Sequence, residues 1–207
     1  MICLALIVIS GANRMVRNQI ASMMVTKLSI LGEYFVVHEM ERTVSKRFRL
    51  LWQELHKDIL TDDMGTMTLF RSALSSKEDD IWAQFATMDL NELFCSGNKD
   101  VILTGAKGRG EIEFFREQLK AYTILLADYT IPDSEDIPEA GAESIYNAIV
   151  KISSKEDLED TVDKLVSAFL GAYDELMEAE VTGPDGEQYI PENIDKKRDK
   201  WDISDVQ

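Results

Sequence analysis

The residues near the start of the chain that could best do chemistry lie in the stretch SGANRMVRN, from Ser10 to Asn18. The stretch directly follows an apolar run that ends at Ile9, and apolar residues at helical spacing come after it. A turn between a buried strand and a helix N-terminus favours an anion, because backbone N–H groups and the helix dipole point toward it. Its candidate phosphate-binding residues are Gly11, Asn13, Arg14, Arg17 and Asn18.

The motif GxxxxGK[ST] is the phosphate-binding loop found at such a place. Its glycines let the backbone approach the phosphates, its lysine neutralises their charge, and its hydroxyl binds Mg²⁺. Only the first glycine of this motif, Gly11, is kept. Val16 replaces the second glycine and disfavours a positive φ, while Arg17 and Asn18 replace the lysine and the hydroxyl residue. By itself, the stretch is more typical of a simple strand-to-helix turn with an exposed arginine.

Other basic residues could face an anion bound near this turn. Four of them form a cluster on a helix expected over residues 41–60: Arg42, Lys46, Arg47 and Arg49. A solvated helix face that pairs with nearby glutamates such as Glu41 explains this cluster at least as well. The further candidates are Arg71, Lys107, Arg109 and Arg116. His38, His56, Cys3 and Cys95 lack the spacing of metal ligands, so no metal site is predicted.

The elements that would position these side chains follow from the apolar patterns. Strands are expected at residues 2–9, 34–37, 100–104, 122–127 and 148–152, with helices between them. This alternation predicts an α/β fold, a parallel sheet of about five strands with helices on both faces. The first strand should be central, because its run is apolar on both faces. Ligands of such sheets bind beyond the carboxyl ends of the strands, here residues 10–18 and 104–111.

The charge of the chain is unevenly distributed. The net charge is −16, and residues 133–207 carry 21 acidic and 7 basic residues, against 17 and 15 in residues 1–132. We expect one domain over residues 1–180 and a charged C-terminal arm over residues 181–207, outside the core. This acidity predicts no direct binding of nucleic acid or of anionic membranes. The sequence has no convincing signal peptide and no apolar stretch of membrane-spanning length, which predicts a cytoplasmic protein.

Residues 100–117, DVILTGAKGRGEIEFFRE, resemble the stretch after a core strand in P-loop deoxynucleoside monophosphate kinases, including phage-encoded ones. In that family the strand ends in Asp-x-Arg, where this chain has Gly105 and Lys107, and a glutamate like Glu111 opens the next helix. Residues 145–166 resemble the family's last strand, turn and closing helix, and residues 133–135 lie at its acidic turn. The order of elements matches from residue 2 to about residue 170.

This resemblance implies a P-loop kinase-like fold whose chemistry has been lost. The family's lysine, hydroxyl and aspartate are replaced here by Arg17, Asn18 and Gly105. We therefore expect a pseudokinase that acts as a binding, inhibitory or structural protein, needs no cofactor, and has a protein partner or a second copy of the chain as partner. If the protein is phage-encoded, the resemblance places it in the host cytoplasm.

Two alternatives remain open. An active deoxynucleoside monophosphate kinase with an atypical loop would use ATP and Mg²⁺, with Arg17 in the role of the lysine. An acidic DNA mimic would use the excess of acidic residues in the C-terminal third of the chain.

Overall fold

The computed structural model describes residues 5–11, 14–55, 64–97, 100–128, 142–152 and 158–181. Its five strands are β1 (Leu6–Gly11), β2 (Phe35–Glu39), β3 (Asp100–Ala106), β4 (Tyr122–Asp128) and β5 (Ala148–Ile152). They form one sheet in the order β2-β3-β1-β4-β5, and each neighbouring pair is parallel. The predicted α/β fold with a five-stranded parallel sheet and a central first strand is confirmed.

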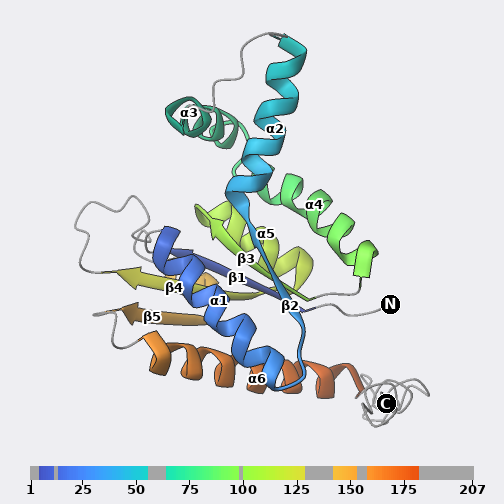
Figure 1. The fold of residues 1–207 in the computed structure, drawn as a ribbon, viewed down its shortest axis with the longest axis vertical. Coiled ribbons are helices and arrows are strands. Elements are labelled where there is room, and N and C mark those ends of the chain that lie inside the picture. The colour runs from blue at the N-terminus through green and yellow to red at the C-terminus, as the bar shows by residue number, and fades with distance from the viewer. Residues whose placement is uncertain are drawn as a thin grey trace, which may run out of the picture. The chain divides into compact units, whose positions relative to one another are not determined.

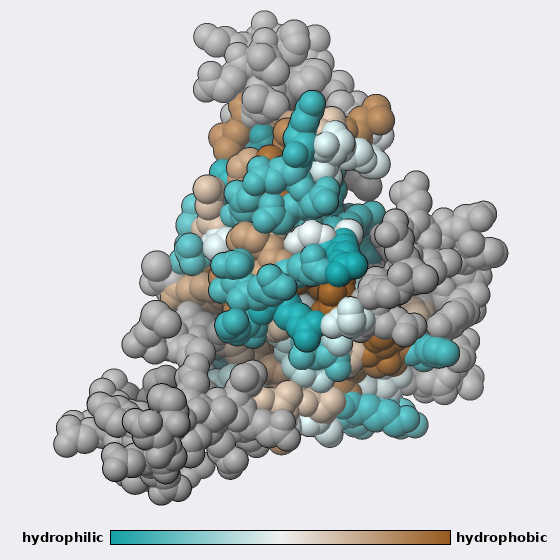
Figure 2. Space-filling view, turned by 180° about the vertical axis from the view of Figure 1, so that it is seen from behind, coloured by the Kyte–Doolittle hydropathy of each residue, from teal (hydrophilic) through white to brown (hydrophobic). Residues whose placement is uncertain are grey.

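Helices surround this sheet (Figure 1). They are α1 (Arg14–Ile30), α2 (Met40–Leu55), α3 (Met64–Ser75), α4 (Ile81–Gly97), α5 (Arg109–Leu119) and α6 (Leu158–Val181), with a short 3-10 helix at Ala142–Ile145. In Figure 1, α1 lies in front of the sheet and α5 behind it. Figure 2 shows the molecule from behind, and hydrophilic residues make up much of the described surface in the middle of that view. The helices therefore cover the sheet and turn polar residues toward solvent.

The core lies on both faces of β1, because successive side chains of a strand point to opposite faces. Leu6 and Val8 belong to the same buried cluster as Trp82 of α4 and Phe115 of α5. Ile7 and Ile9, which point the other way, are also fully buried. Burying each such aliphatic side chain stabilises the fold by about 1.5–3 kcal/mol. The apolar run of the first strand thus accounts for its central position, as expected.

Several expectations concern residues that the structure does not describe. The apolar faces of the helices predict that Trp52 and Trp82 are core residues; Trp82 is buried, whereas the side chain of Trp52 lies outside the described residues. The same holds for Cys3, His56 and residues 133–135. Most of the acidic C-terminal third, including the expected arm beyond Val181, also lies outside them.

Contacts divide the chain into two units, residues 1–166 and 167–207. In the described part of the second unit, the rings of Phe169 and Tyr173 are packed with their centroids 5.6 Å apart. None of the helices within the described ranges combines the length and the apolar composition needed to span a membrane.

Candidate anion-binding site

The carboxyl ends of β1 and β3 lie side by side at a change of direction in the sheet. After β1 the chain passes through α1 to β2, on one side of β1, whereas after β3 it passes through α5 to β4, on the other side. Connections that leave neighbouring strands in opposite directions open a crevice at the strand ends, where α/β proteins bind ligands. The two stretches singled out in the sequence, residues 10–18 and 104–111, therefore meet at one place.

Both strands end in a glycine with a backbone conformation that other residues rarely adopt. Gly11 has a φ of +74°, and a β-carbon there would lie 2.3 Å from the carbonyl oxygen of Leu126. Gly105 has a φ of +86° and is the extra residue of a β-bulge, since Ile9 pairs with Thr104 and Ser10 with Ala106. A β-carbon on Gly105 would lie 2.6 Å from Oε2 of Glu41. The positive φ thus favours glycine at both positions, and close packing against the backbone of β4 adds to this requirement at Gly11.

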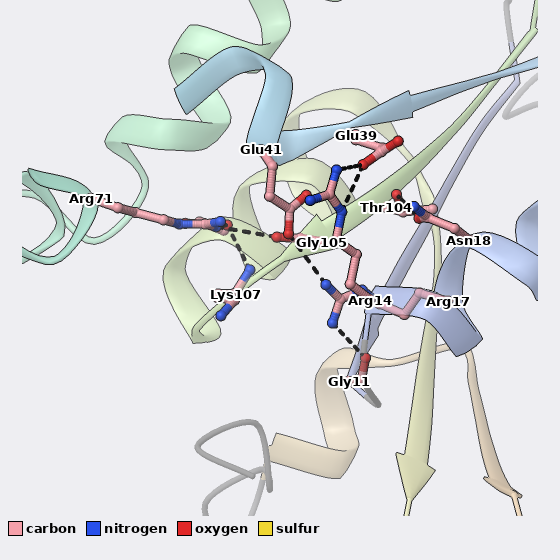
Figure 3. Close-up of polar contacts among 11 residues, drawn as sticks. Gly11, Arg14, Arg17, Asn18, Glu39, Glu41, Arg71, Thr104, Gly105 and Lys107 are labelled. Carbon is pink, nitrogen blue, oxygen red and sulfur yellow. Dashed lines mark hydrogen bonds and ion pairs between the residues drawn. The ribbon is translucent and has the colours of Figure 1, made fainter. Parts of the chain in front are cut away.

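Arg17 points inward, toward Gly11 and Glu41 (Figure 3). Its side chain is only 4% exposed, its Nη1 donates to the carbonyl of Gly11 at 2.9 Å, and its Nη2 lies 3.3 Å from Oε1 of Glu41. Val16 and Arg17 already belong to α1, which begins at Arg14. The residue in the place of the loop lysine therefore links the end of β1 to the start of α2.

Asn18 and Arg14, two further candidates from the sequence, are bound to neighbouring side chains. Thr104 donates to Oδ1 of Asn18 at 3.1 Å, and Asn18 also forms a hydrogen bond with Glu39. Arg14 donates to Oε2 of Glu39 at 2.6 and 3.1 Å. Burial opposes the ionisation of Glu39, but the hydrogen bonds and charge of Arg14, together with Asn18 and Arg42, outweigh it and hold the pKa of this carboxyl below its usual value.

These contacts bear on the Mg²⁺ site that an active kinase would need. Thr104 engages the amide oxygen of Asn18, and arginines engage the carboxylates of Glu39 and Glu41. Within the described ranges, no three His, Cys, Asp or Glu side chains form a group suited to a metal ion. In this arrangement the side-chain oxygens of Asn18, Glu39 and Glu41 already accept hydrogen bonds from other residues of the chain.

A buried ion pair lies on the β3 side of the crevice. Arg71 of α3 donates to both carboxylate oxygens of Glu111, at 2.9 and 3.0 Å, and to the carbonyl of Gly105 at 3.2 Å. The backbone N–H of Lys107 donates to Glu111 at 2.7 Å. Burial raises the pKa of Glu111, and Arg71 and the Lys107 N–H oppose this rise. The pair ties α3 to the end of β3 and the start of α5.

A cleft of about 870 Å³ opens beside these residues, between α2, α3 and the start of α5. Its charged lining has six cationic side chains and two carboxylates: Arg14, Arg42, Lys46, Arg49, Arg71, Lys107, Glu41 and Glu111. Carboxylates just outside the lining lie beside some of these cations: Glu39 beside Arg14 and Arg42, and Asp89 and Glu92 beside Lys46. Clefts of this volume hold small molecules, and this lining favours an anionic one.

The basic cluster of α2 divides between two faces of the helix. Arg42, Lys46 and Arg49 have helical spacing and line the cleft. Arg47 does not line the cleft: its Nη2 lies 3.2 Å from Asp89 of α4, which Lys46 also reaches, and its guanidinium lies 5.2 Å from the ring centre of Phe85. Arg47 therefore has a packing role, and Arg109, which pairs with Glu113 on the surface of α5, does not line the cleft either.

Asp89 anchors the packing of α4 against α2. Burial opposes its ionisation, but hydrogen bonds from Lys46 at 2.7 Å and Thr43 at 2.8 Å, together with the charges of Lys46 and Arg47, outweigh it and lower its pKa. A carboxyl with a lowered pKa stabilises the fold fully above its unfolded pKa, and this contribution is lost as the pH falls through the folded pKa.

We expect the substitution Asp89→Asn to reduce the free energy of unfolding by about 2 kcal/mol at pH 7, because hydrogen bonds to a charged group are lost. The difference from the wild type should shrink below the ordinary pKa of this carboxyl, 3.8. Urea unfolding between pH 7 and pH 3 measures this. Glu92→Gln, at an exposed partner of Lys46, is the control and should change little at either pH. A constant difference across the pH range would contradict the role given to Asp89.

Sequence reasoning missed two residues of the site. Glu41 appeared only as an ion-pair partner and Glu111 only as the residue that opens a helix, yet both line the cleft and hold arginines. The position of Glu41, directly after β2, would have been the signal if the place of β2 beside β3 had been known. Of the remaining candidates, Arg116 donates to the carbonyl oxygen of Ser144 and does not line the cleft, and Asn13 lies outside the described residues.

In comparisons with known proteins, the sequence matches no protein-family model and no curated protein. The resemblance to nucleotide kinases therefore stays a prediction from the sequence.

Proposed function

We propose that this protein has a P-loop kinase-like fold that has lost phosphoryl transfer, and that it binds a phosphate-bearing ligand in the cationic cleft without turnover. The observation that carries the proposal is the burial of Arg17 and its binding to other residues of the chain. A kinase needs a cation at the end of its first strand to stabilise the charge of the transferred phosphoryl group. Here that cation is buried and is bound to Gly11 and Glu41.

Other features support the same proposal. Helix α1 begins at Arg14, before the place of the second loop glycine, so the backbone at Val16 is helical and cannot curve around a phosphate. Gly105 has no carboxylate, and the bulged backbone there disfavours any side chain. The neighbouring cleft nevertheless keeps a cationic lining suited to an anion. The protein would then act by binding alone, and we expect its partner to be another protein or a second copy of the chain.

The second candidate function is an active deoxynucleoside monophosphate kinase. The volume and the cationic lining of the cleft favour it, because they suit a nucleotide-sized anion. It would require Arg17 to leave Glu41 and turn toward the ligand. The DNA-mimic alternative depends on the acidic C-terminal third, most of which lies outside the described residues.

We expect purified protein incubated with ATP, Mg²⁺ and each deoxynucleoside monophosphate to release no ADP above background, whereas kinases turn over at about 1–100 per second. Chromatographic separation of ADP from ATP measures this. The proposal would be overturned if the wild type released ADP, Arg17→Ala abolished this activity and the surface variant Arg109→Ala kept it. That result would establish the active-kinase alternative.

A further inference from the structure

The carboxylate of Glu41 occupies the junction between the cationic cleft and the ends of β1 and β3. Glu41 lies in the first turn of α2, directly after β2, and β2 is paired with β3. Its two carboxylate oxygens would lie 2.6 and 2.9 Å from a β-carbon built on Gly105, so they fill the space that a side chain there would take. The side chain is 28% exposed and also lines the cleft. Figure 3 shows Glu41 between Arg17 and Arg71.

This carboxylate is the counter-charge of Arg17. A guanidinium that is only 4% exposed needs an anion nearby, because an isolated buried charge is strongly unfavourable. Any other anion that reached Arg17 and the end of β1 would have to displace Glu41 or lie beside it, where like charges repel. Glu41 therefore acts as an internal anion at the strand ends.

Further cations line the rest of the cleft, although Lys46 also binds Asp89 and Glu92. Arg42, Lys46 and Arg49 follow one another along the cleft face of α2, and Lys107 lies on the β3 side. Val44 and Leu50 also line the cleft and add apolar surface. This lining suits a phosphate monoester that carries an apolar group.

We propose that Glu41 determines the specificity of the cleft, admitting a single phosphate group and excluding a polyphosphate chain that would extend to Gly11 and Arg17. The inference rests on the proposed function, in which the cleft binds a phosphate-bearing ligand. Replacing Glu41 with glutamine would keep a hydrogen-bond acceptor for Arg17 and remove the negative charge that repels a second anion.

The test is isothermal titration of the full chain with inorganic phosphate and, separately, with tripolyphosphate. We expect the wild type to bind tripolyphosphate no more than about threefold more tightly than phosphate, although tripolyphosphate carries more charge. Glu41→Gln should bind tripolyphosphate at least about tenfold more tightly than the wild type does, with a much smaller change for phosphate. Glu113→Gln, which removes the same charge from the surface of α5, is the control and should bind both anions as the wild type does.

A double variant keeps the test decisive if Glu41→Gln does not fold, as judged by circular dichroism. Arg17→Lys combined with Glu41→Gln removes the repelling carboxylate and replaces the guanidinium with a flexible ammonium that can turn toward solvent. It should still bind tripolyphosphate about threefold more tightly than the wild type, because the repulsion is gone and a cation remains at position 17. If a folded variant still binds phosphate but binds tripolyphosphate only as tightly as the wild type does, the role given to Glu41 is wrong and the proposed function stands. Absence of phosphate binding in the wild type would overturn the proposed function and this inference with it.

Discussion

Replacing Gly11 with alanine is expected to destabilise the protein by about 3 kcal/mol or more, because two separate costs add at this position. The first cost is strain, since an alanine at a φ of +74° adopts a conformation that is unfavourable for residues with a β-carbon. The second is overlap, since the new β-carbon would lie 2.3 Å from the carbonyl oxygen of Leu126 in the neighbouring strand. That carbonyl belongs to β4, which pairs with β1, so relief requires a shift of the sheet.

The control for this prediction is Gly32→Ala. Gly32 also has a positive φ, +90°, but a β-carbon there meets nothing within 4 Å. This variant should lose only the strain component, about 1 kcal/mol. Urea unfolding of both variants measures the difference. Equal losses would show that β1 and β4 adjust freely around Gly11, and the explanation of this glycine by close packing would then be wrong.

Replacing Glu111 with alanine is expected to cost about 3–5 kcal/mol of folding stability, as is usual when one partner of a buried ion pair is removed. Arg71 would keep only the carbonyl of Gly105 among its partners described above, although its side chain is 12% exposed. The backbone N–H of Lys107 would lose its acceptor as well. The substitution should also loosen α3 from the end of β3, and so weaken anion binding in the cleft that Arg71 lines.

The matched control is Glu113→Ala, two residues further along α5. Glu113 pairs with Arg109 on the surface, where an ion pair contributes about 0–1 kcal/mol. Thermal and urea unfolding of the two variants should therefore differ by several kcal/mol. Glu111→Gln, which keeps acceptor oxygen for Arg71, should lie between them. A loss in Glu111→Ala as small as that in Glu113→Ala would contradict the anchoring role of the Arg71–Glu111 pair.

The structure gives a physical reason for the glycine at the end of β3, where the nucleotide kinases have an aspartate. The sequence resemblance treats Gly105 as the loss of a catalytic aspartate. In the structure, Gly105 is a bulged residue with a positive φ, and Glu41 of α2 fills the space beside it. An aspartate could not be introduced there without displacing Glu41, and with it the counter-charge of Arg17. The glycine and the glutamate therefore belong to one arrangement.

Much of the fold could be predicted from the sequence, because periodicity records which faces of an element are buried. The apolar run that ends at Ile9 identified a strand covered on both faces, and the structure places that strand at the centre of the sheet. The strand expected at residues 148–152 has the same bounds in β5. The spacing of Arg42, Lys46 and Arg49 likewise places them on one face of a helix.

Only the tertiary structure decided what each polar face meets. The order of the strands brings the start of α2 over Gly105, so Glu41 binds Arg17, a residue 24 positions away. Likewise Glu111 binds Arg71 across 40 positions, and Lys46 and Arg47 both bind Asp89 on α4. Local patterns say which side of an element is polar, but they carry no information about the neighbour that packing brings to it. For that reason the sequence by itself determined the sheet and the cations near its edge. The packing of α2 and α3 on the strand ends decided the rest, because it pairs Arg17 with Glu41 and brings the cationic side chains together around the cleft.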